Sequence, residues 1–177
     1  MPAITVPAAL SLFALAQAAA PSAAPAPRPS PGAACASAAF RQFDFWIGEW
    51  EVVNQRPPAG RTPPASKSRI TRILDGCAVL EEYETANGYA GKSLNFHDAK
   101  AGRWNQVWID NGGTPLFLKG GMEGASMVMR DESSPINRIT WTPVAGGKVR
   151  QLWETSKDGG RTWEIAFDGM YTPRPAR

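Results

Sequence analysis

Histidine and cysteine are scarce in this chain, and their scarcity excludes several kinds of site. The 177 residues include one histidine, His97, and two cysteines, Cys35 and Cys77. Zinc sites and catalytic triads need clusters of such side chains, and no Asp- and Asn-rich loop resembles a calcium site. An axial haem ligand is the one metal-binding role left for His97, and it requires the ring to face a cavity. We therefore expect no metal site and no cofactor.

Dense positive charge and amphipathic helical patterns are also missing. Lys and Arg number 19 against 16 Asp and Glu, and the basic residues are scattered along the chain. A surface that binds nucleic acid would need them gathered on one face or helix. No long window shows the apolar period of an amphipathic helix. Nucleic acid is thus not an expected partner, and a helical fold is not expected.

The first 20 residues contain no charged side chain and centre on the apolar run Leu10 to Leu15. Small residues follow at 18–20, which is typical of a cleaved signal peptide, and the apolar run is too short for a membrane span. Residues 21–39 are rich in Pro, Ala and Ser and predict a disordered leader. We expect a secreted or periplasmic domain at 40–177, with no stable membrane insertion after cleavage.

The two cysteines are expected to form a disulfide, because an even pair in an exported chain usually does. Cys35 lies where the leader meets the domain, and Cys77 follows a turn at Asp75-Gly76. The bond would tie the N-terminal segment to the body of the domain. A lipid anchor on Cys35 is the alternative, but this cysteine lies far beyond the apolar run.

From Phe40 onward, apolar and polar residues alternate with the period of a β-strand. Val79, Glu81 and Tyr83, for example, share one strand face. Turn signals such as Asn87-Gly88 separate about ten such segments. The predicted strands are 43–52, 68–74, 78–86, 89–97, 103–110, 115–120, 126–130, 137–143, 148–154 and 162–171.

Short connections between these strands predict an all-β fold, an antiparallel up-and-down β-barrel of about 8–10 strands. Closure into a barrel removes the exposed edges of a long antiparallel meander. A two-sheet sandwich is the alternative, but its crossovers need longer connections than the sequence contains.

The stretch SKDGGRTW, residues 156–163, resembles the Asp-box of sialidases. A sialidase propeller needs many more strands than this chain can supply, and the motif appears once. We expect Asp158 to accept backbone N–H groups in a hairpin turn, which is a structural role.

Several longer stretches resemble one family of small exported bacterial proteins that has no assigned function. They are RQFDFWIGEWEV, ILDGC, KSLNF, GRWNQVWID, RITWTP, VRQLWETSKDGGRTW and FDGMY. The resemblance spans residues 35–171 and implies a secreted β-barrel without naming a substrate. Gly48-Glu49-Trp50 is also similar to the Gly-x-Trp signature on the first strand of lipocalins and other calycins, in which a tryptophan closes one end of the barrel.

Amides alternate with tryptophans on several predicted strands. Gln106, for example, lies between Trp104 and Trp108. A dry core has no use for unpaired amides, whereas a cavity lined by indoles and a few amides suits a small molecule. We therefore expect non-catalytic binding of a small apolar or aromatic ligand. The predicted lining is Trp46, Trp50, Asn95, Trp104, Gln106, Trp108, Gln151 and Trp153.

Two aspartates offer a catalytic alternative, since Asp44 in FDFW and Asp168 in FDGMY are flanked by aromatic residues. Burial there would raise the pKa of a carboxyl group, which general acid catalysis uses. The alternative functions are a hydrolase acting on a glycan or an ester, and a periplasmic structural or interaction module with a filled barrel. The sequence leaves the identity of the ligand and the oligomeric state open.

Overall fold

The structure is a computed structural model that describes residues 33–62 and 64–174. The predicted signal peptide and residues 21–32 of the predicted leader lie outside the described residues. The end of that leader is structured, because Ala33–Cys35 and Ala38–Arg41 form short 3-10 helices, η1 and η2. The described part of the domain thus begins before Phe40, where the sequence pattern placed its start.

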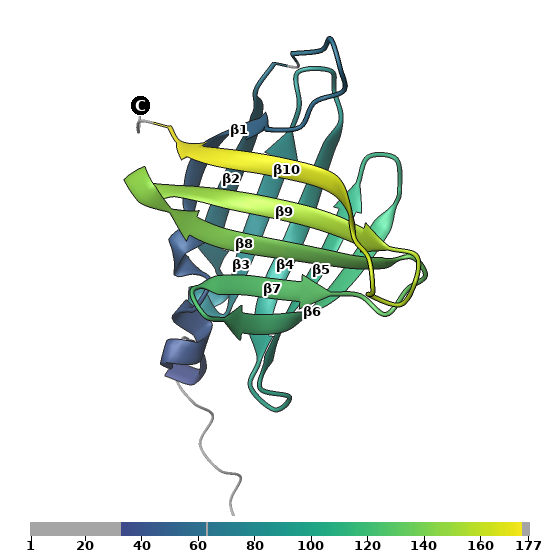
Figure 1. The fold of residues 1–177 in the computed structure, drawn as a ribbon. Coiled ribbons are helices and arrows are strands. Elements are labelled where there is room, and N and C mark those ends of the chain that lie inside the picture. Colours follow the sequence, from purple (N-terminus) through teal and green to yellow (C-terminus); the bar gives the residue numbers. More distant parts are fainter. Residues whose placement is uncertain (1–32, 63, 175–177) are drawn as a thin grey trace, which may run out of the picture.

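Within the described residues, ten antiparallel strands form one closed barrel (Figure 1). Each strand pairs with its neighbours in the sequence, and β1 closes the barrel by pairing with β10. The prediction of an all-β, up-and-down barrel is confirmed, and the sandwich alternative is wrong. The strands are β1 (Gly48–Asn54), β2 (Ser66–Ile73), β3 (Ala78–Glu84), β4 (Ala90–Asp98), β5 (Arg103–Asp110), β6 (Pro115–Glu123), β7 (Ser126–Arg130), β8 (Ile136–Val144), β9 (Lys148–Ser156) and β10 (Glu164–Pro173).

The segment before β1 does not extend the first strand, which corrects the prediction of a strand at 43–52. Asp44–Trp46 forms a 3-10 helix, η3, and β1 begins two residues later. This helix buries Phe43 and Trp46 completely. The Phe43 ring centroid lies 4.8 Å from that of Trp46, 5.3 Å from that of Trp141 and 5.7 Å from that of Trp104. Ring packing of this kind stabilises the helical turn in preference to an extended strand.

The barrel therefore has two different ends. At the packed end, where β1 begins and β2 ends, η2 and η3 cover the barrel, and the N-terminal helices are drawn in purple and dark blue in Figure 1. At the open end, β3 runs into β4 and β9 runs into β10 through short hairpin turns. The remaining 3-10 helices, η4 (Leu74–Gly76) and η5 (Ala145–Gly147), connect strands at the packed end.

The β9–β10 turn contains the Asp-box-like stretch. Asp158 Oδ1 accepts the backbone N–H groups of Arg161 and Thr162, at 3.0 and 2.9 Å. The bonds from Thr162 are the main reason that the pKa of Asp158 is lowered, to about 2. The predicted structural role of this aspartate is confirmed.

A disulfide between Cys35 and Cys77 joins η1 to the residue that follows η4, as predicted, and spans a sequence separation of 42. It holds the N-terminal helices against the packed end. None of the helices in the described part has the length and apolarity that a membrane crossing requires.

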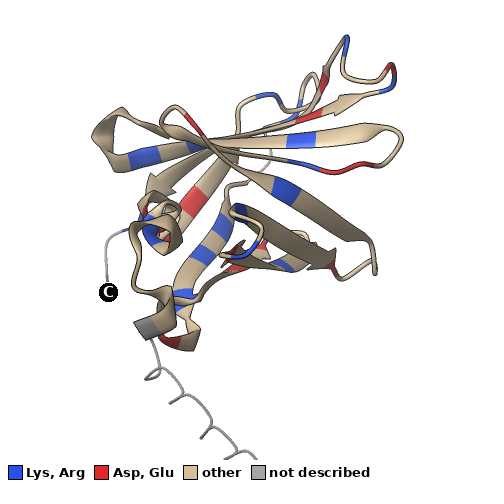
Figure 2. Ribbon diagram, turned by 90° about the horizontal axis from the view of Figure 1, so that it is seen from below, with Lys and Arg blue, Asp and Glu red and all other residues tan. Residues whose placement is uncertain are grey.

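Charged residues are distributed over the outside of the molecule. Figure 2 shows basic and acidic positions interspersed along strands and loops, in the view from below. Many of them form exposed ion pairs, such as Lys92 with Glu82 at 2.6 Å. Pairs of this kind contribute little to stability.

Candidate functional site

A cavity of about 240 Å³ occupies the barrel interior toward the open end. Strand register explains its lining, because Ser93 on β4 is paired with Glu81 on β3 and with Trp108 on β5, and the three side chains face inward. The residues at the mouth of the cavity are Tyr83, Tyr89, Trp108, Leu116, Trp153, Ala166 and Phe167. Those deeper in the barrel are Glu81, Gln106, Ile139, Trp141, Gln151 and Tyr171.

The mouth of the cavity is largely aromatic. The Tyr83 ring centroid lies 6.3 Å from that of Trp108 and 6.4 Å from that of Tyr89, both edge to face. Gly91 makes room for the indole, because a Cβ atom at this position would lie 2.2 Å from the Trp108 ring. The missing side chain thus lets Trp108 lie against β4.

The cavity floor carries a buried carboxyl group, that of Glu81, which is 4% exposed. Its Oε2 accepts the hydroxyl of Ser93 at 2.9 Å, and its Oε1 accepts the hydroxyl of Ser68 at 3.2 Å. The Tyr171 hydroxyl oxygen lies 3.4 Å from Glu81 Oε1 but only 2.6 Å from Gln151 Oε1. Because that hydroxyl has a single proton, the shorter distance assigns its hydrogen bond to Gln151.

Burial determines the ionisation of this cluster. Removal from water raises the pKa of Glu81 to about 7, although the hydrogen bonds from Ser93 and Ser68 lower it. Burial also raises the pKa of Tyr171 well above its ordinary value. A carboxyl group that titrates near neutral pH inside an aromatic cavity is a typical feature of functional sites.

Four of the eight residues predicted to line a ligand site do line this cavity: Gln106, Trp108, Gln151 and Trp153. The Trp153 indole N–H donates to Asn137 Oδ1 at 2.8 Å, which fixes the ring at the mouth. Asn95 lies behind the lining, where its Oδ1 accepts Gln106 Nε2 at 2.7 Å.

The other three predicted lining residues, all tryptophans, belong to the buried core. Trp46 and Trp104 pack around Phe43 at the packed end, and the Trp50 indole N–H donates to the Trp46 carbonyl at 3.0 Å. Trp50 and Trp104 share the inward face of the barrel with the cavity residues but lie at a different depth, whereas Trp46 is on η3. None of the three is part of the cavity lining.

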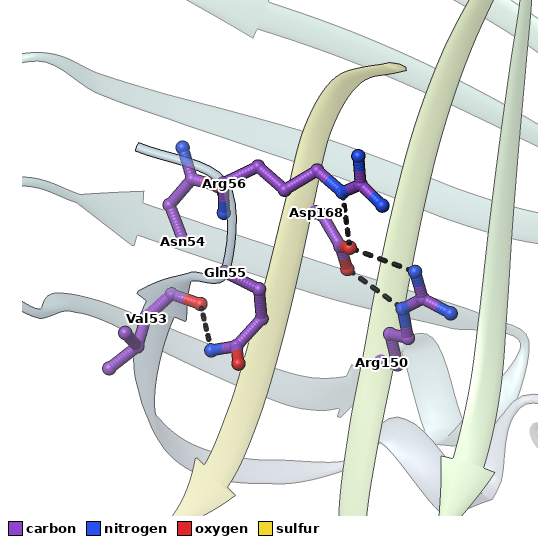
Figure 3. Close-up of polar contacts among 6 residues, drawn as sticks. All are labelled: Val53, Asn54, Gln55, Arg56, Arg150 and Asp168. Carbon is purple, nitrogen blue, oxygen red and sulfur yellow. Dashed lines mark hydrogen bonds and ion pairs between the residues drawn. The ribbon is translucent and has the colours of Figure 1, made fainter. Parts of the chain in front are cut away.

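Asp168, a catalytic candidate, is on β10, where its carboxylate points toward Arg150 and Arg56 (Figure 3). It does not line the cavity. Arg150 holds it through two hydrogen bonds of 2.7 and 2.8 Å, and Arg56 lies 3.7 Å away. The hydrogen bonds from Arg150 lower the pKa of Asp168 below its usual range, despite burial. The expected rise in its pKa is therefore wrong, because paired guanidinium groups outweigh desolvation.

Asp44, the other catalytic candidate, is in η3 at the packed end, where Arg72 Nη2 lies 2.5 Å from its Oδ2. His97 is also at this end, between the rings of Phe40 and Trp104, at centroid distances of 5.2 and 5.9 Å. Neither residue lines the cavity. Among residues 33–62 and 64–174, no cluster of three or more His, Cys, Asp or Glu side chains could hold a metal ion.

The sequence interpretation missed Glu81 as a site residue, although the signal was present. Its alternation with Val79 and Tyr83 places it on an apolar strand face, where a charged side chain is unusual. Tyr171 was missed for a different reason, because β3 and β10, which bring it to Glu81, are distant in sequence.

A larger hollow of about 650 Å³ lies on the outer surface and is bordered mainly by charged side chains. Several of these already form ion pairs, such as Arg69 with Glu49 and Lys67 with Glu84. Its walls are more polar than those of the inner cavity, whereas small-molecule sites are mostly apolar, so the inner cavity is the candidate site.

No protein-family model matches this chain, and a search of curated proteins found no match. The arguments for function therefore come from the cavity and its residues.

Proposed function

We propose that this chain is an exported protein that binds a small apolar or aromatic ligand in the cavity at the open end of the barrel, without catalysis. The observation that carries the proposal is the cavity itself, in which aromatic walls surround a few polar groups. Small-molecule sites have this composition. At about 240 Å³ the cavity is smaller than the ~300–1,000 Å³ of typical ligand pockets, so a compact ligand of one or two rings fits best.

Export is supported by two features. The uncharged, apolar N-terminal stretch has the pattern of a signal peptide. The Cys35–Cys77 disulfide is of the kind that persists in the periplasm or outside the cell. The similarity of the sequence motifs to small exported bacterial proteins, and of Gly48-Glu49-Trp50 to calycins, agrees with this proposal.

The chemistry of the cavity favours binding over hydrolysis. Glycosidases commonly need two carboxyl groups on opposite sides of the scissile bond, whereas Glu81 is the single carboxyl group among the lining residues. Asp44 and Asp168 are both held in ion pairs away from the cavity. A filled barrel is disfavoured by the volume that remains between the aromatic walls.

Calorimetric titration with phenylethanol, a neutral one-ring probe, tests this proposal. We expect saturable binding that quenches or shifts tryptophan fluorescence, and we expect Trp108→Ala to abolish it with the fold intact. Phe117→Ala is the matched control, because Phe117 is on the outer face of the neighbouring strand and 59% exposed. Unchanged binding in Trp108→Ala would contradict this site.

Native mass spectrometry of protein purified from its own host adds a second readout. A reproducible extra mass that disappears on denaturation would identify a natural occupant of the cavity.

A further inference from the structure

The carboxyl group of Glu81 has no compensating positive charge in the described structure. The groups that face it are the hydroxyls of Ser68 on β2, Ser93 on β4 and Tyr171 on β10. Tyr83 is the other titratable side chain coupled to it. No salt bridge among the described residues includes Glu81, and no Lys, Arg or His lines the cavity.

The surrounding hydrogen bonds are nevertheless arranged for a carboxylate. Asn95 Nδ2 donates to the Val79 carbonyl at 3.2 Å and to Ser93 Oγ at 2.9 Å. The Ser93 hydroxyl thus accepts from Asn95 and gives its own proton to Glu81 Oε2. Gln106 Nε2 donates to Asn95 Oδ1, so the chain of donors runs from the cavity wall toward Glu81. Such a chain stabilises an acceptor, which is the ionised form.

A buried carboxylate that accepts two hydrogen bonds but lacks a cation is electrostatically incomplete. The missing partner has to come from the cavity, because the neighbouring strands contribute only neutral groups. The cavity walls suit a cation as well, since ammonium groups are attracted to the faces of tryptophan and tyrosine rings. Trp108, Trp153 and Tyr83 present such rings at the mouth.

We infer that the cavity takes a compact aromatic or apolar amine, whose single ammonium group pairs with the Glu81 carboxylate while its ring packs among the aromatic walls. This inference rests on the proposed binding function and names the class of ligand.

Three probes that share a phenyl ring test the inference: phenylethylamine, phenylethanol and phenylacetate, each titrated into the full folded chain by calorimetry. At about pH 8 we expect the amine to bind roughly 10- to 100-fold more tightly than the alcohol, as for a hydrogen bond to a charged group. Phenylacetate should bind most weakly. In Glu81→Gln the amine should lose its advantage while the alcohol binds as before. Glu82→Gln is the matched control, because Glu82 is on the outer face and pairs with Lys92.

The wild-type protein supplies an independent readout if the Glu81 variant does not fold. The preference for the amine should fall about tenfold between about pH 8 and about pH 6, because Glu81, with a pKa of about 7, goes from mostly ionised to mostly protonated while an alkylammonium stays charged. The two tyrosines near Glu81 have raised pKa values and stay neutral in this interval.

The outcomes separate this inference from the function on which it rests. Equal affinity for amine and alcohol, or a preference that survives Glu81→Gln, would overturn the amine assignment and leave the cavity as a binding site. Tighter binding of phenylacetate would overturn it in favour of an acid ligand. If none of the three probes binds up to its solubility limit, both proposals fail.

Discussion

The two ends of the barrel are both rich in aromatic rings, but only one end is filled. At the packed end, Phe43 and Trp46 from the N-terminal segment stack 4.8 Å apart and are fully buried. At the open end, Trp108 and Trp153 are half-buried and border a cavity. The difference comes from a chain segment outside the barrel, which fills one end, whereas no described segment fills the other. Aromatic content alone therefore does not distinguish core from ligand site.

Truncating one tryptophan at each end gives the largest expected contrast. Trp46→Ala should lower the free energy of unfolding by about 3–5 kcal/mol, as for other buried aromatic residues. Trp153→Ala should cost less than about 2 kcal/mol, because its ring already contacts solvent. Urea denaturation of both variants measures the difference, and probe titration should show that only the Trp153 change lowers ligand affinity. Similar losses of stability would mean that the open end is also packed core.

The barrel was predictable because period-two alternation and glycine-rich turns act locally. The alternation of apolar and polar residues within each strand predicts which side chains point into the barrel. Turns such as Asn87-Gly88 determine where the chain reverses. The start of β1 was not predictable in this way. The pattern from Phe43 to Trp50 also fits a strand, and only tertiary packing of Phe43 and Trp46 at the packed end selects the 3-10 helix.

The depth of a residue in the barrel was the main thing that the sequence could not show. Trp104, Gln106 and Trp108 share one face of β5, yet Trp104 is in the core and Trp108 is at the cavity mouth. Alternation predicts whether a side chain points into the barrel. Whether it then lies in the core or at the cavity mouth depends on which end of the barrel the N-terminal segment covers. Glu81 could have been singled out from its apolar strand face, but the cluster around it could not, because Ser93 and Tyr171 reach it from other strands.

Glu81 lies between the two ends, and its titration should appear in the stability of the whole fold. Burial raises its pKa from about 4.5 to about 7, so the folded state binds the proton more tightly than the unfolded state does. Stability should therefore fall as pH rises through this interval, by about 3 kcal/mol for a shift of this size. Denaturant titrations at a series of pH values measure this slope.

The Glu81→Gln variant should lose this component of the slope, while Glu82→Gln, which changes an exposed carboxylate on the outer face, should keep it. A saturating concentration of an amine probe should also reduce the loss of stability at high pH, because the bound ammonium group stabilises the Glu81 carboxylate. If wild type and Glu81→Gln have the same pH profile, Glu81 does not titrate in this interval, and its environment is more polar than the buried cluster implies.

Substitutions in the hairpin turns should have the smallest effect on stability, and the effect should be similar at the two ends of the barrel. Asp158 supports the β9–β10 turn at the open end, and Asp98 supports the β4–β5 turn at the packed end by accepting the N–H groups of Lys100 and Ala101. Asp158→Asn and Asp98→Asn should each cause a small decrease in Tm at neutral pH. For Asp158 the difference from wild type should shrink as pH falls toward about 2, because its lowered pKa stabilises the fold only while the carboxylate is ionised. Thermal scans test this, and a loss of probe affinity in Asp158→Asn would show instead that this turn shapes the cavity mouth.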